Sequence, residues 1–195
     1  MQTKLGITGG IGSGKSVVSH IMRCCGVPVY DCDSNSKRLT VSDPIIRERL
    51  TELLGAAVYT DDGRLNKPLL ADYLFASDDH VRIVNGIIHP RVRADIALWA
   101  SRQHCSLVGV ESAIFFEADF TDVVDKIVMV SAPEEVRIAR VMNRDNTTAD
   151  AVRHRISRQM SDEEKVRRSD FCIVNDGCRP LLPQVLQLVD GLRLK

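Results

Sequence analysis

The sequence predicts an α/β fold with a parallel five-stranded sheet and helices on both faces. Three observations support this class. Short apolar runs alternate with helical patterns along all 195 residues. The runs at 106–111 and 126–131 are almost wholly apolar, as expected of parallel strands covered on two faces. The first apolar run passes through glycines directly into a helical pattern. The length suits one domain that carries an insertion.

The chain begins with a strand, a glycine turn and a helix. Residues 4–8 predict a buried strand, and 15–24 predict a helix with apolar positions 17, 18, 21 and 22 on one face. Between them, 9–16 read GGIGSGKS and match G-x-x-x-x-G-K-[ST]. In that motif, backbone N–H groups surround a polyphosphate at the positive end of a helix. Lys15 would reach the β- and γ-phosphates, and the Ser16 hydroxyl would bind Mg²⁺. The alternative, a glycine turn without a ligand, does not explain the Lys-Ser ending.

The second strand, at 27–30, ends on two carboxylates, Asp31 and Asp33. Phosphoryl transfer to an alcohol needs a group that orients the hydroxyl and accepts its proton, and Asp33 is the candidate. Asp31 would point the other way if strand alternation persists. Alternatively, both residues cap the helix that follows, and spacing alone leaves the two interpretations open. That helix is predicted over 36–54, with Asp43 and Pro44 starting its second part.

A long, mostly helical insert follows, at about 67–104, and has few strand signals. It predicts a subdomain rather than more sheet. Pro90 lies inside it and predicts a kink or a restart of the helix. His89 beside it would ordinarily be structural.

Two acidic residues lie at the end of the third predicted strand, at 106–111, and in the segment after it. Glu111 ends that strand, where phosphate-loop enzymes carry an acidic residue that supports Mg²⁺, and Glu117 is a second candidate. For both, an exposed loop carboxylate is the alternative. The fourth strand, at 126–131, leads to a helix at 133–142 with acidic residues in its first turn.

Basic side chains are dense in the predicted helices at 133–142, 148–160 and 162–168. One use is a lid that brings arginines to a transferring phosphoryl group, and the other is a solvated helix face. The solvated face is favoured for most of them, with Arg140 as the exception, because it lies on the inner part of its helix. Interrupting acids and the lack of aromatic residues argue against a nucleic-acid surface. The run comprises Arg137, Arg140, Arg144, Arg153, Arg155, Arg158, Lys165, Arg167 and Arg168. A strand at 171–174 and a helix at 181–192 close the chain.

Composition excludes several classes of protein. A formal net charge of zero gives no overall attraction to nucleic acid or an anionic membrane. No apolar run reaches the length of a membrane span, and the first strand begins too early for a targeting segment. The six cysteines have neither C-x-x-C nor zinc-ligand spacing, and most lie in apolar runs. They predict buried, reduced thiols and a cytoplasmic protein, with a disulfide framework as the alternative.

Together these stretches resemble the dephospho-coenzyme A kinase family. The phosphate loop is shared by many families, but the Asp-x-Asp, the His-Pro in the insert and the closing Ile-x-Asn-x-Gly are much more specific in combination. The resemblance runs nearly end to end, through 7–16, 26–33, 88–93, 116–117, the helix with arginines 137, 140 and 144, 158–159, and 169–177.

The resemblance implies a P-loop NTPase-type kinase with a helical acceptor-binding insert at about 60–105 and an Arg-rich lid at about 140–168. It implies transfer of phosphate from ATP, with Mg²⁺, to the ribose 3′-hydroxyl of dephospho-CoA, and no obligate protein partner. The implied catalytic residues are Asp33, Lys15 and Arg140. The implied ATP-binding residues are Gly10, Ile11, Gly12, Ser13, Gly14, Lys15, Ser16, Val17 and Asn175, with Asn175 near the adenine. The implied acceptor-binding residues are Asp33, His89 and Arg93, and the metal would be held by Ser16 with Glu111.

The sequence departs from the family pattern at three places. Ser112 and Ala113 stand where Pro-Leu is usual, Cys32 replaces an alanine, and Val17 replaces a frequent threonine. The first departure concerns the loop after Glu111, and so the outer shell of the metal. A different small-molecule kinase of the same fold is one rival interpretation. A GTP-driven switch is another, but its Asn-Lys-x-Asp and Asp-x-x-Gly patterns do not occur.

Overall fold

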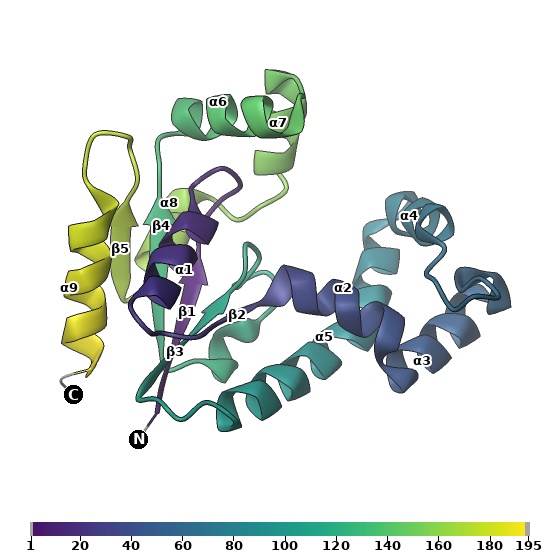
Figure 1. Cartoon of the computed structure of the whole chain (residues 1–195). Helices are drawn as coiled ribbons and strands as arrows, with labels where there is room; N and C mark the ends of the chain where they lie inside the picture. Colours follow the sequence, from purple (N-terminus) through teal and green to yellow (C-terminus); the bar gives the residue numbers. More distant parts are fainter. Residues whose placement is uncertain (1, 194–195) are drawn as a thin grey trace. The chain divides into compact units, whose positions relative to one another are not determined.

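The computed structural model describes residues 2–193 and contains a five-stranded parallel sheet (Figure 1). The strand order is β2-β3-β1-β4-β5, so the strand before the phosphate loop lies at the centre. This confirms the predicted fold class. The strands are β1 (Thr3–Thr8), β2 (Val29–Asp31), β3 (Leu107–Glu111), β4 (Lys126–Ser131) and β5 (Phe171–Val174).

The described chain forms two compact units. Unit 1 comprises residues 2–31 and 99–193, and unit 2 comprises residues 32–98. Unit 2 therefore begins earlier than the insert at about 60–105 that the resemblance implies. The α-helices are α1 (Lys15–Cys24), α2 (Cys32–Ser42), α3 (Pro44–Leu54), α4 (Lys67–Ala76), α5 (Asp78–Ser101), α6 (Glu134–Asp145), α7 (Ala149–Ile156), α8 (Asp162–Arg167) and α9 (Leu181–Arg193). Two 3₁₀ turns, η1 (Ala56–Val58) and η2 (Phe120–Val123), complete them.

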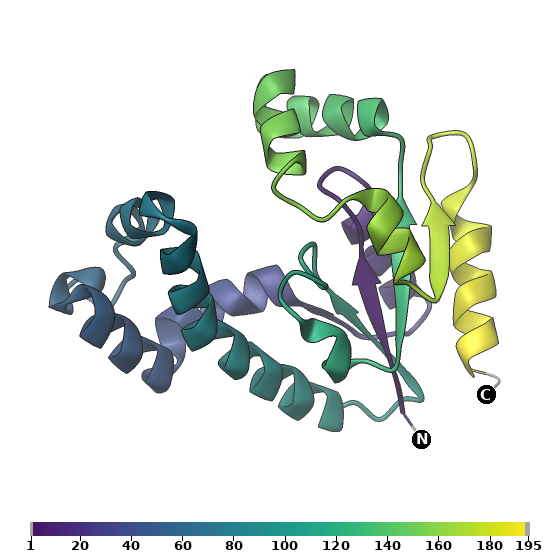
Figure 2. The ribbon, with the colours of Figure 1, turned by 180° about the vertical axis from the view of Figure 1, so that it is seen from behind.

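Helices cover both faces of the sheet in unit 1. α1 and α9 pack together on one face, and α8 and η2 lie on the other (Figures 1 and 2). The core between the sheet, α1 and α9 is built from β-branched and leucine side chains, among them Leu5, Ile7 and Val128, which are fully buried. Burial of each such side chain contributes roughly 1.5–3 kcal/mol to the free energy of unfolding. This cluster therefore fixes the position of β1, which leads directly into the phosphate loop.

The strand register sets which residues meet at the carboxyl edge of the sheet. Ile7 pairs with Glu111 on one side of β1, and Thr8 pairs with Met129 on the other. Asp31 at the end of β2 pairs with the same Glu111. The phosphate loop therefore leaves the sheet beside the Glu111 carboxylate, at the edge where open α/β sheets bind ligands.

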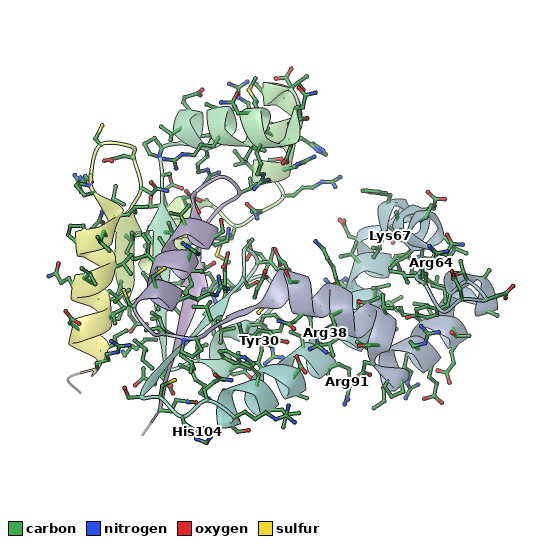
Figure 3. The ribbon with its side chains drawn as sticks, viewed as in Figure 1. Tyr30, Arg38, Arg64, Lys67, Arg91 and His104 are labelled. Carbon is green, nitrogen blue, oxygen red and sulfur yellow. The ribbon has the colours of Figure 1, made fainter. Side chains whose placement is uncertain are left out.

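Unit 2 consists of helices held by caps and ion pairs. Asp43 caps α3, because its Oδ1 accepts hydrogen bonds from the N–H groups of Ile45 and Ile46. Its other oxygen lies 2.9 Å from a guanidinium nitrogen of Arg91 on α5. The predicted cap at Asp43 is thereby confirmed, and the buried carboxylate also joins two helices. Arg38 on α2 reaches Asp95 on α5, and Figure 3 labels Arg38 and Arg91.

Three local predictions are wrong in whole or in part. Pro90 does not restart a helix, since α5 continues through it, whereas the alternative of a kink stays a prediction. Val17 is not on the buried face of α1: it is 48% exposed, whereas Val18 and Met22 are fully buried. Of the six cysteines, all free thiols, only Cys32 is buried, so flanking apolar residues were a poor guide to their depth. Within residues 2–193, no helix has the length and apolarity needed to cross a bilayer.

Candidate active site

The loop from Gly9 to Ser16 joins β1 to α1 in a conformation that needs glycine. Gly14 has φ of 94° and stands at the N-terminus of α1 without a side-chain cap. The left-handed region is favourable for glycine, which has no Cβ. The first N–H groups of α1 therefore have no side-chain acceptor at Gly14, which is the arrangement that binds phosphate at a helix N-terminus.

Neighbouring side chains approach the loop so closely that two of its glycines have no room for a methyl group. A Cβ on Gly10 would lie 2.3 Å from Nη1 of Arg137 on α6, and one on Gly14 would lie 2.2 Å from Nδ2 of Asn175 after β5. These distances are far below ordinary van der Waals contact. The loop is therefore enclosed by α6 on one side and by the β5–α9 connection on the other.

Lys15 and Ser16 open α1 at the mouth of the loop. The Lys15 ammonium donates to the Gly9 carbonyl over 2.9 Å, across the loop, and Ser16 is exposed in the first helical turn. The hydroxyls of Thr8 and Ser13 are buried beside the loop and have no hydrogen-bond partner among the described residues. A polar lining with unmet hydrogen-bonding capacity fits a polyphosphate and its metal better than it fits a plain turn.

Glu111 stands at the end of β3, in register with Asp31. Burial raises the pKa of its carboxyl above the usual range, although the Ser19 hydroxyl and the Lys15 ammonium favour the ionised form. The nearby Asp31 carboxylate raises the pKa further. Glu111 is thus a partly buried acid beside a cation, which suits support of a metal and not an exposed loop position.

The donors present fit a phosphate-loop magnesium. Across the described residues, no group of three or more His, Cys, Asp or Glu side chains is placed to hold a metal. Such a group is not needed, because phosphate oxygens and water supply most ligands of Mg²⁺ in these loops. The Ser16 hydroxyl and the Glu111 carboxylate are the donors that this chain offers.

Arg140 and Asn175 form a hydrogen-bonded chain that ends on the phosphate loop. The two terminal guanidinium nitrogens of Arg140 donate to the backbone carbonyl and to Oδ1 of Asn175, at 3.1 and 3.3 Å. Asn175 Nδ2 in turn donates to the Ser13 carbonyl over 2.8 Å. The family resemblance implies separate positions for Arg140, near the phosphates, and Asn175, near the adenine, and the structure joins the two side chains by hydrogen bonds.

Arg137 is not on a solvated helix face, so that prediction is wrong for this residue. Its side chain is buried against Gly10, and its Nη1 lies 2.5 Å from the Asp162 carboxylate at the start of α8. Its Nε is buried and has no hydrogen-bond partner within residues 2–193. The charge run could not indicate this burial, because the partner lies 25 residues further along the chain.

Lys165 and Glu117 form a second ion pair, in which the lysine is buried and the glutamate is partly open to solvent. Lys165 is completely buried, and its ammonium lies 3.0 Å from the Glu117 carboxylate and 3.0 Å from the Ala113 carbonyl. Glu117 Oε1 also accepts a hydrogen bond from the Met160 N–H, over 2.8 Å. Glu117 is therefore engaged in joining the loop after β3 to the segment before α8. Lys165 is a further exception to the predicted solvated face.

Gln159 is a residue of the site to which sequence analysis gave no role. Its Oε1 accepts a hydrogen bond from the backbone N–H of Ile11, over 3.0 Å. A polar residue in the connection from α7 to α8 thus contacts the phosphate loop directly. In the sequence, Gln159 is indicated only by the Arg158-Gln159 pair, which is one of the stretches that carry the family resemblance.

The residues expected to act on the acceptor lie in unit 2. Asp33 is the second residue of α2, two positions after Asp31 at the end of β2. It lies inside the first helical turn and not before it, where a carboxylate favours the helix dipole. His89 and Arg93 lie one turn apart on α5. Burial lowers the pKa of His89, and the nearby Arg93 charge lowers it further.

Comparison with known families gives one consistent match. The family model described as dephospho-CoA kinase matches residues 3–180. The chain is 53% identical to the dephospho-CoA kinase of Bacteroides fragilis strain YCH46, covering 100% of this chain and 95% of the relative. It is 41% identical to that of Porphyromonas gingivalis W83, covering 98% and 95%.

Solved structures agree with this match. A Thermus thermophilus crystal structure superposes with a TM-score of 0.86 at 32% identity, covering 97% of both chains. The dephospho-CoA kinase of Campylobacter jejuni gives 0.72 at 20% identity, covering 100% and 98%. Shikimate kinase of Acinetobacter baumannii gives 0.57 at 16% identity, covering 100% and 97%. The last two show a shared fold alone.

Proposed function

The chain belongs to the dephospho-CoA kinase family and is a transferase that phosphorylates dephospho-CoA with ATP, and we propose how its residues divide this work. In this proposal, Lys15 and Arg140 neutralise the charge of the transferring phosphoryl group, and Asp33 orients or deprotonates the ribose 3′-hydroxyl. The γ-phosphoryl passes in line from ATP to that oxygen. The product is CoA.

The phosphate loop is the observation that carries the proposal. Its turn is enclosed by Arg137 and Asn175, the Lys15 ammonium lies across it, and α1 opens without a side-chain cap. Each feature favours a polyphosphate over a neutral ligand. Gly10, Ile11, Gly12 and Ser13 would contribute backbone groups, and Ser16 would stand beside them.

The metal would be held by Ser16, with Glu111 in its outer shell. When bound, Mg²⁺ neutralises negative charge on the phosphates. The chain's own residues orient the groups: Lys15 can leave the Gly9 carbonyl for a phosphate oxygen, and Arg140 carries two terminal nitrogens suited to a forked contact.

Unit 2, residues 32–98, is proposed to bind the acceptor through Asp33, His89 and Arg93. A His89 with a lowered pKa is neutral near pH 7 and can donate one hydrogen bond and accept another, while Arg93 offers charge to an acceptor phosphate. The segment at about 140–168 is proposed as a lid that keeps water from ATP. Six free thiols support a cytoplasmic location.

An acceptor screen with ATP and Mg²⁺, read by product mass, tests the substrate assignment. Dephospho-CoA should yield a 3′-phosphorylated product and should protect the protein against heating, whereas AMP and shikimate should do neither. Phosphorylation of AMP or shikimate at a comparable rate would favour another small-molecule kinase of this fold.

The role of Asp33 is tested by Asp33→Asn, with the exposed Asp72→Asn on α4 as the matched control. Loss of an acid–base group typically lowers turnover by about 10²–10⁴-fold. ATP affinity should stay near the wild-type value, because the substitution leaves the phosphate loop intact. Unchanged turnover would remove Asp33 from the mechanism, and Asp72→Asn should leave both quantities unchanged.

A further inference from the structure

The backbone N–H of Ile11 in the phosphate loop is already occupied by a side chain. Gln159 Oε1 accepts from it over 3.0 Å. N–H groups of this loop are the donors that a polyphosphate would use if the loop binds ATP as proposed. Under that use of the loop, a phosphate oxygen and the Gln159 carbonyl oxygen would compete for the Ile11 N–H.

The backbone next to Gln159 is held by an ion pair whose lysine is fully buried. The N–H of Met160 donates to Glu117 Oε1 over 2.8 Å, and the same carboxylate pairs with the fully buried Lys165 at 3.0 Å. The Lys165 ammonium is fully buried, so loss of its Glu117 partner would leave a buried charge without its counter-ion. In this structure these contacts hold the backbone beside Gln159, and the Gln159 side chain is the part that reaches the phosphate loop.

The side chain has room to rotate and the chemistry to make rotation useful. Gln159 and Arg137, which both contact the phosphate loop, help to line a cavity of about 640 Å³. A carboxamide presents an acceptor on one side and two N–H donors on the other. A half turn about the Cγ–Cδ bond exchanges them, and a glutamate in the same place has no donor to exchange.

We propose that Gln159 is a further ATP-contacting residue that changes its hydrogen-bonding role when nucleotide binds. Without nucleotide, its carbonyl oxygen caps the Ile11 N–H. With nucleotide, a phosphate oxygen takes that N–H, and the rotated Gln159 Nε2 donates to the polyphosphate. The amide thus favours binding in the second state instead of opposing it. The inference rests on the proposed use of the phosphate loop for ATP.

The test compares Gln159→Glu and Gln159→Ala with Gln187→Glu, an exposed residue of α9, as the control for added charge. Two quantities are measured on the full chain: the Kd of Mg²⁺-ATP by calorimetry, and hydrogen exchange of the Ile11 amide by NMR without nucleotide. A charge-assisted hydrogen bond of about 1.5–3 kcal/mol corresponds to a roughly ten- to hundredfold change in Kd.

The two variants should separate the two roles of the amide. In Gln159→Ala, exchange at Ile11 should accelerate, and the Kd for ATP should rise only about threefold, because the lost donor is offset by the removed competitor. In Gln159→Glu, Ile11 should stay protected and the Kd should rise at least about tenfold, because the carboxylate keeps the N–H and repels phosphate. Gln187→Glu should change neither.

Three results would overturn the inference. The first is a wild-type rate of hydrogen exchange at the Ile11 amide in Gln159→Ala, and the second is wild-type ATP affinity in Gln159→Glu. The third is an equal loss of ATP affinity in both variants, because rotation of the Gln159 carboxamide would then have no effect on binding. Lys15→Ala distinguishes these from failure of the proposed function. If that variant bound ATP as tightly as the wild type, the phosphate loop would not be the ATP site, whatever Gln159 does.

Discussion

The side-chain amide of Asn175 donates a hydrogen bond to the backbone carbonyl of Ser13 over 2.8 Å, and so joins the end of β5 to the phosphate loop. Asn175 is 8% exposed and also accepts from Arg140 on α6. One amide therefore links three segments that are far apart in the sequence. The shape of the loop depends on that amide as well as on its own glycines.

Replacing Asn175 with aspartate should weaken ATP binding. The carboxylate keeps an acceptor for Arg140 but has no N–H for Ser13, and it brings a negative charge toward the carbonyl. The KM for ATP should rise about tenfold, the effect of roughly 1.4 kcal/mol, with a smaller change for the acceptor. Steady-state kinetics with each substrate varied in turn would measure this. Asn143→Asp, exposed on α6, is the control, and an equal effect there would contradict the prediction.

Replacing Gly14 with alanine should be far more harmful than replacing Gly191. At Gly14 a Cβ meets Asn175 at 2.2 Å and the φ of 94° disfavours alanine, whereas a Cβ on Gly191 in α9 meets nothing within 4 Å. Gly14→Ala should abolish measurable ATP binding and lower Tm. Gly191→Ala should stabilise the protein by about 0.5–1 kcal/mol through helix propensity. Calorimetry would compare the ATP affinities of the two variants, and thermal melts would compare their stabilities. Equal melting temperatures would show that the close approach of Asn175 to Gly14 does not exclude a methyl group there.

Replacing Glu111 with glutamine should raise stability and lower activity at neutral pH. The pKa of Glu111 is raised in the folded protein, so the folded state favours the protonated carboxyl. The stability that Glu111 contributes is complete below its unfolded-state pKa and is lost as the pH rises through its folded-state pKa. Glutamine does not ionise, so the variant does not lose stability in this way. Tm of Glu111→Gln should therefore exceed the wild-type Tm at pH 7 and converge with it in acid, while its Mg²⁺-dependent turnover falls. A lower Tm at pH 7 would contradict the argument.

Replacing Lys165 with methionine should destabilise the fold strongly. The substitution removes the contacts of a fully buried ammonium with the Glu117 carboxylate and the Ala113 carbonyl, and hydrogen bonds to charged groups contribute about 1.5–3 kcal/mol each. Lys126→Met is the matched control: its pair with Asp170 is exposed and contributes at most about 1 kcal/mol. Urea unfolding would give both values. Similar midpoints for the two variants would mean that Lys165 is not a structural cation.

The sequence predicts this structure best where one local pattern determines an element. The strand at 126–131 and the helix at 15–24 match the structure at both ends, because an apolar run and an amphipathic period each encode one element. The phosphate loop could be predicted for the same reason, because the spacing of its glycines, lysine and serine is itself the phosphate-binding motif. The cap at Asp43 is another local signal, and it was read correctly.

The errors concern residues whose surroundings come from distant parts of the chain. Arg137 and Lys165 belong to a basic run that is typical of a solvated face, yet Asp162 and Glu117 hold them in the interior. Gln159 had no assigned role because its partner, the Ile11 N–H, lies 148 residues away. Pairing across such separations follows from the folded arrangement and has no periodic signature in the sequence.

Pro90 within α5 has a consequence for how that helix opens. Proline has no N–H, so the carbonyl oxygen of Gly86, four residues earlier, lacks its usual helical donor. Backbone opening should therefore begin in the middle turn of α5 and spread outward, in contrast to the fraying from both ends that an uninterrupted helix undergoes. His89 lies in that turn, so its local environment would be the first in the helix to change on warming.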